Sequence, residues 1–292
     1  MENKSKNVQI GFILHFVFKK CIFVFPNQLH TQSSKEVVAF PNQKSEKNRS
    51  MSLSKNQIKL IRSLNQKKSR HKHGLFVVEG TKTVQEFLSS SFELDALFVT
   101  DALHSTFDAL NFQEVLPSEI KKISALTNPS GVLALFRIPK IEMLDARGLV
   151  LALDGVNDPG NLGTIIRLCD WFGISQLVCS KNTVDCFNPK VVQATMGSLT
   201  RVQIHYVDLE RYLQTSTAPK YMADMNGEDV YKSNLPEEAI LIMGNEANGV
   251  CQEIQKQCTH RLSIPRFGIL QKTESLNVAS ATAILLSEFK RS

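Results

Sequence analysis

The chain has 292 residues, of which 42% are hydrophobic and 21% charged, with a formal net charge of +6. This length and composition suit one large or two modest globular domains, and they exclude collagen-like, coiled-coil and wholly disordered proteins. Residues 1–50 carry eight lysines and arginines against three acids, which leaves a net charge of only +1 for residues 51–292. The whole-chain charge is therefore no argument for a nucleic-acid partner.

The first fifty residues differ from the rest of the chain. Their apolar run IGFILHFVFKKCIFVF is broken by Lys19 and Lys20, and each flank is too short to span a bilayer. No small-x-small cleavage site follows it. Met51 begins MSLSKNQIKLIRSL, which is typical of a protein start followed by a capped helix. We interpret residues 1–50 as a disordered or upstream translated extension, and a targeting segment is the alternative.

Residues 51–140 are predicted to form a small α/β domain. The pattern predicts a helix over 51–70, a strand in GLFVVEG, a helix over 81–88, a strand in LDALFVTDAL, a helix in EVLPSEIKKISAL and a strand in GVLALFRIP. Residues 139–148 are the predicted linker to the second domain.

The start of this domain is strongly basic. Seven cations and no acid lie between Met51 and Val78, although the remainder of the body is mildly acidic. Such an arm suits contact with a polyanion, and a solvated helix face is the alternative. The seven cations are Lys55, Lys59, Arg62, Lys67, Lys68, Arg70 and Lys72.

Residues 148–292 are predicted to form a second α/β domain. The apolar segments LVLALD, SQLVCS, RVQIHYV, PKYMADM and AILIMG read as strands. They alternate with helices predicted in NLGTIIRLCDWFG, NPKVVQATMGSLT and DLERYLQ, and a C-terminal helix over about 275–290. Continuous apolar strands between helices predict a parallel sheet that is covered on both faces.

The six cysteines do not suggest a metal site. None forms a C-x-x-C pair, and two pairs are spaced by seven residues, which is not a zinc spacing. Several lie in apolar runs and are interpreted as small buried thiols. We expect a reducing, cytoplasmic setting and no metal.

Ligands of open α/β sheets bind at the carboxyl ends of the strands, so the loops there are candidate sites. In DGVNDPGNLGTIIR, Asn161 is a candidate N-cap, and Arg167 is a cation among apolar residues that requires a partner or a task. An arginine extending from the helix surface is the alternative. The glycines of this loop miss the dinucleotide-binding spacing.

Two later loops complete the candidate site. In GNEANGV, Gly244 and Gly249 allow the backbone to approach a flat ligand, and Glu246 either caps the next helix or pairs with Arg167. The loop has no lysine, which makes it a poor phosphate cradle. In SIPRFGILQKTESLNV, Ile264 ends a strand, and 275–277 open a helix for which Ser275 is the candidate N-cap.

Together, and in this order, the three loops resemble the three motifs of the SpoU/TrmH family of RNA 2′-O-ribose methyltransferases. NLGTIIR matches the first motif, GNEANGV the second, and IP…SLNVASA the third, with ATMGSL between the first and second. FVVEGTKTVQEF and NPSGVLAL resemble the RNA substrate-binding domain that is fused to many of these enzymes. The resemblance covers about residues 53–291, and the segment 269–274 is longer than the family pattern.

The resemblance implies a parallel-sheet domain with a trefoil knot, which binds S-adenosylmethionine in the knot and forms a homodimer through it. It favours ribosomal RNA over transfer RNA as substrate, because the fused N-terminal domain is common among ribosomal-RNA enzymes, and transfer RNA is the alternative. Since a guanidinium stays protonated, we expect the arginine to hold a phosphate rather than act as a base. The implied catalytic residues are Asn161, Arg167, Glu246, Ser275 and Asn277, and the implied cofactor-binding residues are Gly244, Gly249, Ile264 and Leu276.

Three other functions stay open at this point. A non-catalytic RNA-binding protein would retain the fold, but the five catalytic positions argue against it. A nucleotide-dependent oxidoreductase is disfavoured by the missing dinucleotide fingerprint. A base methyltransferase of the wider knotted superfamily is expected to lack the SLN motif. The RNA and the nucleotide that is modified are not encoded in any motif.

Overall fold

The computed structural model describes residues 52–140, 147–270, 272 and 275–291. The extension over 1–50, most of the predicted linker and part of the long segment 269–274 therefore lie outside the described residues. The first part of the chain forms a four-stranded mixed sheet in the order β1-β4-β2-β3. Its elements are α1 (Lys55–Ser63), α2 (Lys67–His73), β1 (Leu75–Glu79), α3 (Thr81–Leu88), β2 (Leu94–Val99), the 3-10 helix η1 (Asp101–Leu103), α4 (His104–Phe107), β3 (Gln113–Glu114), α5 (Pro117–Ile123) and β4 (Val132–Arg137).

The second part forms a six-stranded sheet in the order β10-β8-β9-β5-β6-β7, and every neighbouring pair in it is parallel. Its elements are β5 (Leu149–Asp154), α6 (Pro159–Trp171), β6 (Gln176–Ser180), α7 (Pro189–Thr195), η2 (Ser198–Thr200), β7 (Gln203–Val207), α8 (Leu209–Thr215), β8 (Lys220–Asp229), η3 (Val230–Lys232), β9 (Ala239–Gly244), α9 (Gln252–Gln255), β10 (His260–Ser263) and α10 (Val278–Arg291).

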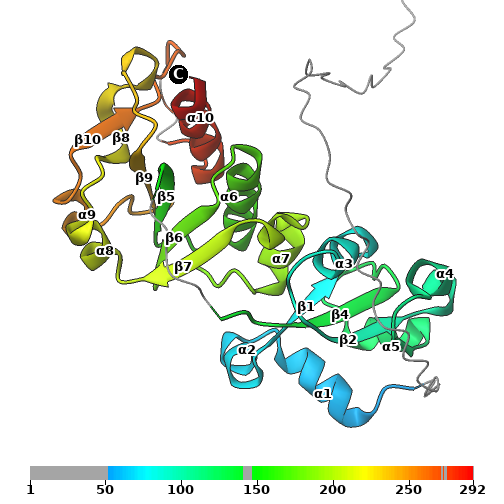
Figure 1. The fold of residues 1–292 in the computed structure, drawn as a ribbon. Coiled ribbons are helices and arrows are strands. Elements are labelled where there is room, and N and C mark those ends of the chain that lie inside the picture. The colour runs from blue at the N-terminus through cyan, green and yellow to red at the C-terminus, as the bar shows by residue number, and fades with distance from the viewer. Residues whose placement is uncertain (1–51, 141–146, 271, 273–274, 292) are drawn as a thin grey trace, which may run out of the picture. The chain divides into compact units, whose positions relative to one another are not determined.

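Both faces of the parallel sheet are covered, as the apolar strands predict (Figure 1). Successive residues of β5 point to opposite faces, so Leu151 joins the core under α6, α7 and α10, whereas Val150 joins the core under α8 and α9. The predicted α/β class with a parallel sheet is confirmed.

One apolar core also connects the two sheets. It contains Phe76 of β1 and Phe136 of β4 together with Leu151 of β5 and Val191 of α7. The ring of Phe187, just before α7, lies 4.6 Å from that of Phe76. A continuous close-packed core transmits displacements between the elements that share it.

Several helix boundaries differ from the sequence prediction, each for a local reason. The helix expected over 51–70 is two helices, and the first begins with a capping box between Ser54 and Gln57. The helix expected through ATMGSLT ends at Thr195, because Met196 and Gly197 adopt positive φ of 51° and 96°. The short elements α4, β3 and α9 were not predicted. Each has four residues or fewer, which is too short to show periodicity.

Candidate functional site

The loop after β5 is shaped by Asp158, which is the N-cap of α6. Its Oδ1 accepts a hydrogen bond from the backbone N–H of Asn161 at 2.8 Å. The prediction that Asn161 is the cap is therefore wrong. The cap lies three residues earlier than predicted, with Pro159 at the first helical position. The carboxamide of Asn161 is left free for other contacts.

That carboxamide joins the three candidate loops. Asn161 Nδ2 donates to Oε1 of Glu246 at 2.9 Å, and Asn161 Oδ1 accepts from Nδ2 of Asn277 at 2.9 Å. The three side chains come from the helix after β5, the loop after β9 and the start of α10. Because β5 and β9 are parallel neighbours with Asp154 opposite Gly244, their carboxyl ends meet at this edge of the sheet. We refer to Asn161, Glu246 and Asn277 as the Asn161 cluster.

The loop after β9 closes on itself through its glycines. The backbones of Asn245 and Gly249 exchange two hydrogen bonds of 2.9 Å. A Cβ on Gly244 would lie 2.3 Å from the carbonyl carbon of Gly249, and Gly249 has a φ of 67°. Both glycines are thus required by the loop itself, whereas the sequence interpretation assigned them to the approach of a ligand.

Two further bonds fix the second loop to the first. Asn245 Nδ2 donates to the carbonyl of Gly155 at 2.6 Å. The backbone N–H of Cys251 donates to Oδ2 of Asp154 at 2.8 Å. Asn245 is not among the site residues predicted from the sequence, although an asparagine directly after a buried strand and before a glycine loop is a signal for such a turn.

The third loop contributes Asn277, which caps α10. Its Oδ1 accepts hydrogen bonds from the backbone N–H groups of Ala279 at 2.9 Å and Ser280 at 3.3 Å. The helix therefore begins at Val278, and the prediction of Ser275 as N-cap is wrong. Ser275 and Leu276 are exposed, and among the described residues no hydrogen bond connects Ser275 to the Asn161 cluster. Ile264 follows β10 and is half-buried.

Arg167 lies apart from the Asn161 cluster. It is exposed on α6, six residues and about 9 Å along the helix from Asn161. Within the described part of the chain it forms no ion pair with Glu246, whose carboxylate binds Asn161 instead. Glu246 does not cap α9 either, since the residue at that position is Cys251. Both predicted roles of Glu246 are wrong. Arg167 lines an open groove together with Thr164, Leu168, Asp170, Trp171, Met196 and Ser198.

The basic arm is largely available to a polyanion. Six of its seven cations are exposed on α1 and α2. The exception is Arg70, which is 1% exposed and bound to Asp185. A cation that is buried in an ion pair cannot contact a phosphate, so the prediction that Arg70 belongs to the contact surface is wrong.

The described cysteines are mostly buried thiols. Burial raises the pKa of Cys169, Cys179 and Cys186 well above the usual value, and that of Cys258 to about 11. One group of potential metal ligands does occur in the first sheet region, where single ligand atoms of Asp101, His104 and Glu114 lie within 4.8 Å of one another.

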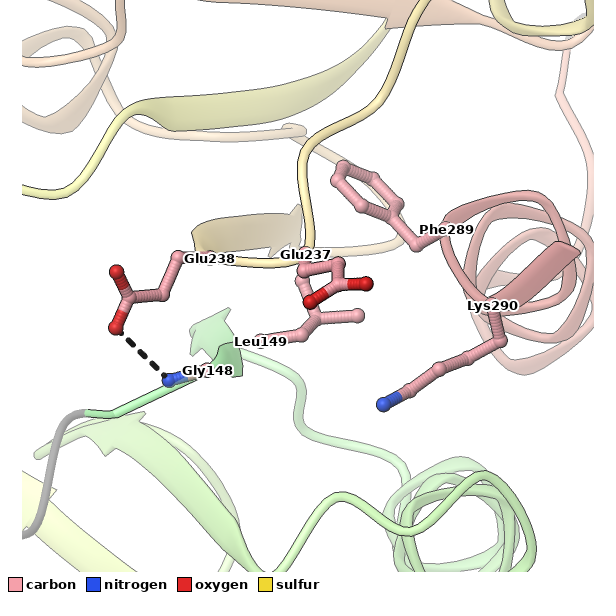
Figure 2. Close-up of a pocket in the computed structure, with 6 residues that line it drawn as sticks. All are labelled: Gly148, Leu149, Glu237, Glu238, Phe289 and Lys290. Atoms are coloured by element: carbon pink, nitrogen blue, oxygen red, sulfur yellow. Dashed lines mark hydrogen bonds between the residues drawn. The ribbon is translucent and has the colours of Figure 1, made fainter. Parts of the chain in front are cut away.

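A second hollow lies at the opposite edge of the parallel sheet. Figure 2 shows it beside Gly148 and Leu149, at the amino end of β5, with Glu237, Glu238 and Lys290 around it. The backbone N–H of Gly148 donates to Oε1 of Glu238 at 3.5 Å. None of the predicted site residues lines this hollow. None of the helices in the described part of the chain has the length and apolarity that a bilayer crossing requires.

Comparison with known proteins identifies the family. Residues 148–287 match the SpoU rRNA methylase family, and residues 55–134 match the MRM3-like substrate-binding domain. The chain is 32% identical over 240 residues to the 23S rRNA (guanosine(2553)-2′-O)-methyltransferase RlmP of Bacillus subtilis, covering 80% of this chain and 95% of that protein. The chain belongs to the SpoU rRNA methylase family.

Solved structures of RNA methyltransferases agree in fold with most of the chain. A structure assigned to the TrmH family of RNA methyltransferases, from Porphyromonas gingivalis, is 41% identical, with a TM-score of 0.74 over 82% of this chain and 99% of that one. An AdoMet-bound rRNA methyltransferase from Sinorhizobium meliloti is 30% identical, with a TM-score of 0.73 over 82% and 96% of the two chains. The resemblance inferred from the three loops is confirmed.

Proposed function

We propose that this protein transfers the methyl group of S-adenosylmethionine to a ribose 2′-hydroxyl of RNA, and that ribosomal RNA is the substrate. The observation that carries the proposal is the Asn161 cluster, which joins the three loops at the carboxyl edge of the parallel sheet. The family membership and the relatives named as 2′-O-methyltransferases of ribosomal RNA support it.

The residues at this edge fit the cofactor. The segments 154–161 and 244–251 contain no lysine or arginine, and they carry Asp154, Asp158 and Glu246. Such a set of backbone groups and acids suits a cationic sulfonium and would oppose a phosphate. S-Adenosylmethionine supplies an electrophilic methyl group when bound. Gly244, Gly249, Ile264 and Leu276 are the proposed cofactor-binding residues.

The protein contributes positioning and charge stabilisation. The Asn161 cluster holds the three loops in one arrangement, so that the hydroxyl oxygen and the methyl group can be aligned. Arg167 holds the phosphate of the target nucleotide and stabilises the charge that develops on the oxygen. Because both ends of the Asn161 carboxamide are already bound, the Ser275 hydroxyl or a water molecule passes the proton of the 2′-hydroxyl on to the solvent.

The exposed cations of α1 and α2 supply affinity for the RNA backbone. Contacts between cations and phosphates are independent of sequence and weaken as salt rises. The choice of RNA then depends on shape or on an unstacked loop.

We also propose that the methyltransferase region, residues 148–292, is knotted and that it forms a homodimer in the cytoplasm. The groove beside Arg167 exposes 85% of Trp171 and 55% of Met196. Large apolar side chains that are exposed together mark an interaction surface. The part of this face around Trp171 and Met196 is therefore the proposed site of contact with a second copy, with Arg167 at its edge.

Transfer of label tests the proposed function. The purified chain is incubated with methyl-labelled S-adenosylmethionine and ribosomal RNA from a strain that lacks the gene, and acid-insoluble label is counted. We expect stable incorporation into ribosomal RNA and little incorporation into transfer RNA in a parallel incubation. RNA binding without incorporation would instead indicate a non-catalytic RNA-binding protein.

A further inference from the structure

Arg70 connects both basic helices to the methyltransferase region. Its Nε and Nη2 donate to Oδ2 of Asp185 at 3.0 and 2.5 Å. Its Nη1 donates to the carbonyl oxygens of Leu64 and Asn65 at 2.8 and 3.0 Å, where α1 ends. Arg70 itself belongs to α2. One guanidinium thus ties α1 and α2, which carry the exposed cations, to the segment between β6 and α7.

Asp185 is equally fixed on its other side. It is 8% exposed, and its Oδ1 accepts a hydrogen bond from the backbone N–H of Phe187 at 3.2 Å. The neighbouring Val184 donates its N–H to the carbonyl of Val156 at 3.0 Å. Val156 lies in the loop after β5 that leads to Asp158 and Asn161. A short path of hydrogen bonds and backbone therefore connects Arg70 to the Asn161 cluster.

Tyr206 of β7 holds the same segment from a second direction. Its hydroxyl donates to the carbonyl of Val184 at 2.6 Å and accepts from the N–H of Cys186 at 2.7 Å. Lys67 of α2 lies over the Tyr206 ring, with its Nζ 5.7 Å from the centroid. Arg201 also forms ion pairs with Glu86 and Asp170, but these pairs are solvent-exposed and contribute little to stability.

We propose that Arg70 is a positioning residue, which keeps the RNA-contacting cations of α1 and α2 in register with the Asn161 cluster. The inference rests on the proposed function. A buried ion pair is weak evidence for stability, and its best-supported role is to fix the relative position of the elements that it joins. Four hydrogen bonds in two directions require the planar fork of arginine, which lysine does not provide. Bound RNA would then present its ribose at a fixed place relative to the site.

Kinetics of Arg70 and Asp185 variants test this inference. Arg70→Met and Asp185→Asn are assayed with ribosomal RNA at a temperature at which calorimetry shows each variant to be folded. We expect kcat at saturating RNA to fall about tenfold or more, and the affinity for S-adenosylhomocysteine to stay within about twofold. Arg70→Lys should recover part of the loss. The two substitutions combined should cost little more than either alone, because they remove one shared interaction.

The salt dependence separates positioning from phosphate contact. Since Arg70 touches no phosphate, Arg70→Met should leave the slope of log affinity against log salt unchanged. Lys68→Met, an exposed cation on the same helix, should raise KM and reduce the slope by about 0.7 to 0.9, with kcat retained. Arg211→Met is the neutral control, because Arg211 is exposed on α8, which carries neither the Asn161 cluster nor the cations of the basic arm.

The outcomes distinguish the two proposals. Unchanged kcat in Arg70→Met and Asp185→Asn, with an active wild type, overturns the positioning role alone. Loss of S-adenosylhomocysteine binding in step with kcat also overturns it, because the ion pair would then support the fold of the site itself. An inactive wild type overturns the proposed function, and the positioning role with it.

Discussion

Asn277 performs two tasks with the two ends of one side chain. Its oxygen caps α10, and its Nδ2 donates to Asn161. Asn277→Asp retains the cap but replaces the donor with an acceptor. We expect methyl transfer to fall about tenfold or more, while the free energy of unfolding changes by less than about 1 kcal/mol. Asn277→Ala should lose activity and, in addition, about 1 kcal/mol of stability in urea titration. Full activity of the aspartate variant would show that the bond to Asn161 is dispensable.

Substitution of Arg167 directly tests the role proposed for it in methyl transfer. Arg167→Ala should abolish transfer and spare binding of S-adenosylhomocysteine, because the side chain lies in a groove apart from the Asn161 cluster. Arg167→Lys should also be poor, since a point charge replaces a planar fork. Arg211→Ala serves as the matched control on an exposed helix. Near wild-type transfer by Arg167→Ala would contradict the assignment.

At the scale of elements, the position of α6 depends on a glycine. A Cβ on Gly163 would lie 2.4 Å from the Cβ of Ala194 and 3.0 Å from the carbonyl oxygen of Val191, both in α7. Gly163→Ala should therefore destabilise the protein by about 1–3 kcal/mol through overpacking. The pair Gly163→Ala with Ala194→Gly should recover part of this in urea denaturation. If the single variant were as stable as the wild type, the two helices would be less closely packed than described.

The elements themselves were largely predictable from the sequence, whereas the contacts between them were not. The strands β5, β6 and β9 stand out as apolar runs, and α6 stands out as an apolar helical segment followed by Gly173. The caps were misplaced at Asn161 and Ser275, because asparagine, aspartate and serine serve equally well and lie within three residues of each other. The predicted pairing of Glu246 with Arg167 was wrong, because periodicity does not say how a helix is rotated against a distant loop. Nothing in the sequence distinguishes the buried Arg70 from the exposed cations that neighbour it.

At the scale of the whole molecule, Trp171 reports on association, because it is the single tryptophan of the chain. It is 85% exposed in the isolated chain. If α6 contacts a second copy, its fluorescence emission should shift to shorter wavelength as protein concentration rises through the dimerisation range. Trp171→Glu should shift sedimentation toward the monomer, whereas a substitution of the exposed Lys190 should not. Emission that is independent of concentration, with a monomeric wild type, would contradict a dimer through this face.

The central claim is that the methyl group is placed on a ribose 2′-oxygen of ribosomal RNA, and the position of the methyl group tests it most directly. Ribosomal RNA treated with the protein and S-adenosylmethionine is digested to nucleosides and analysed by mass spectrometry, alongside alkaline hydrolysis. We expect one additional 2′-O-methylated nucleoside and a phosphodiester bond that resists alkali, both absent with Arg167→Ala. A methyl group found on a base, with every bond cleaved by alkali, would contradict it.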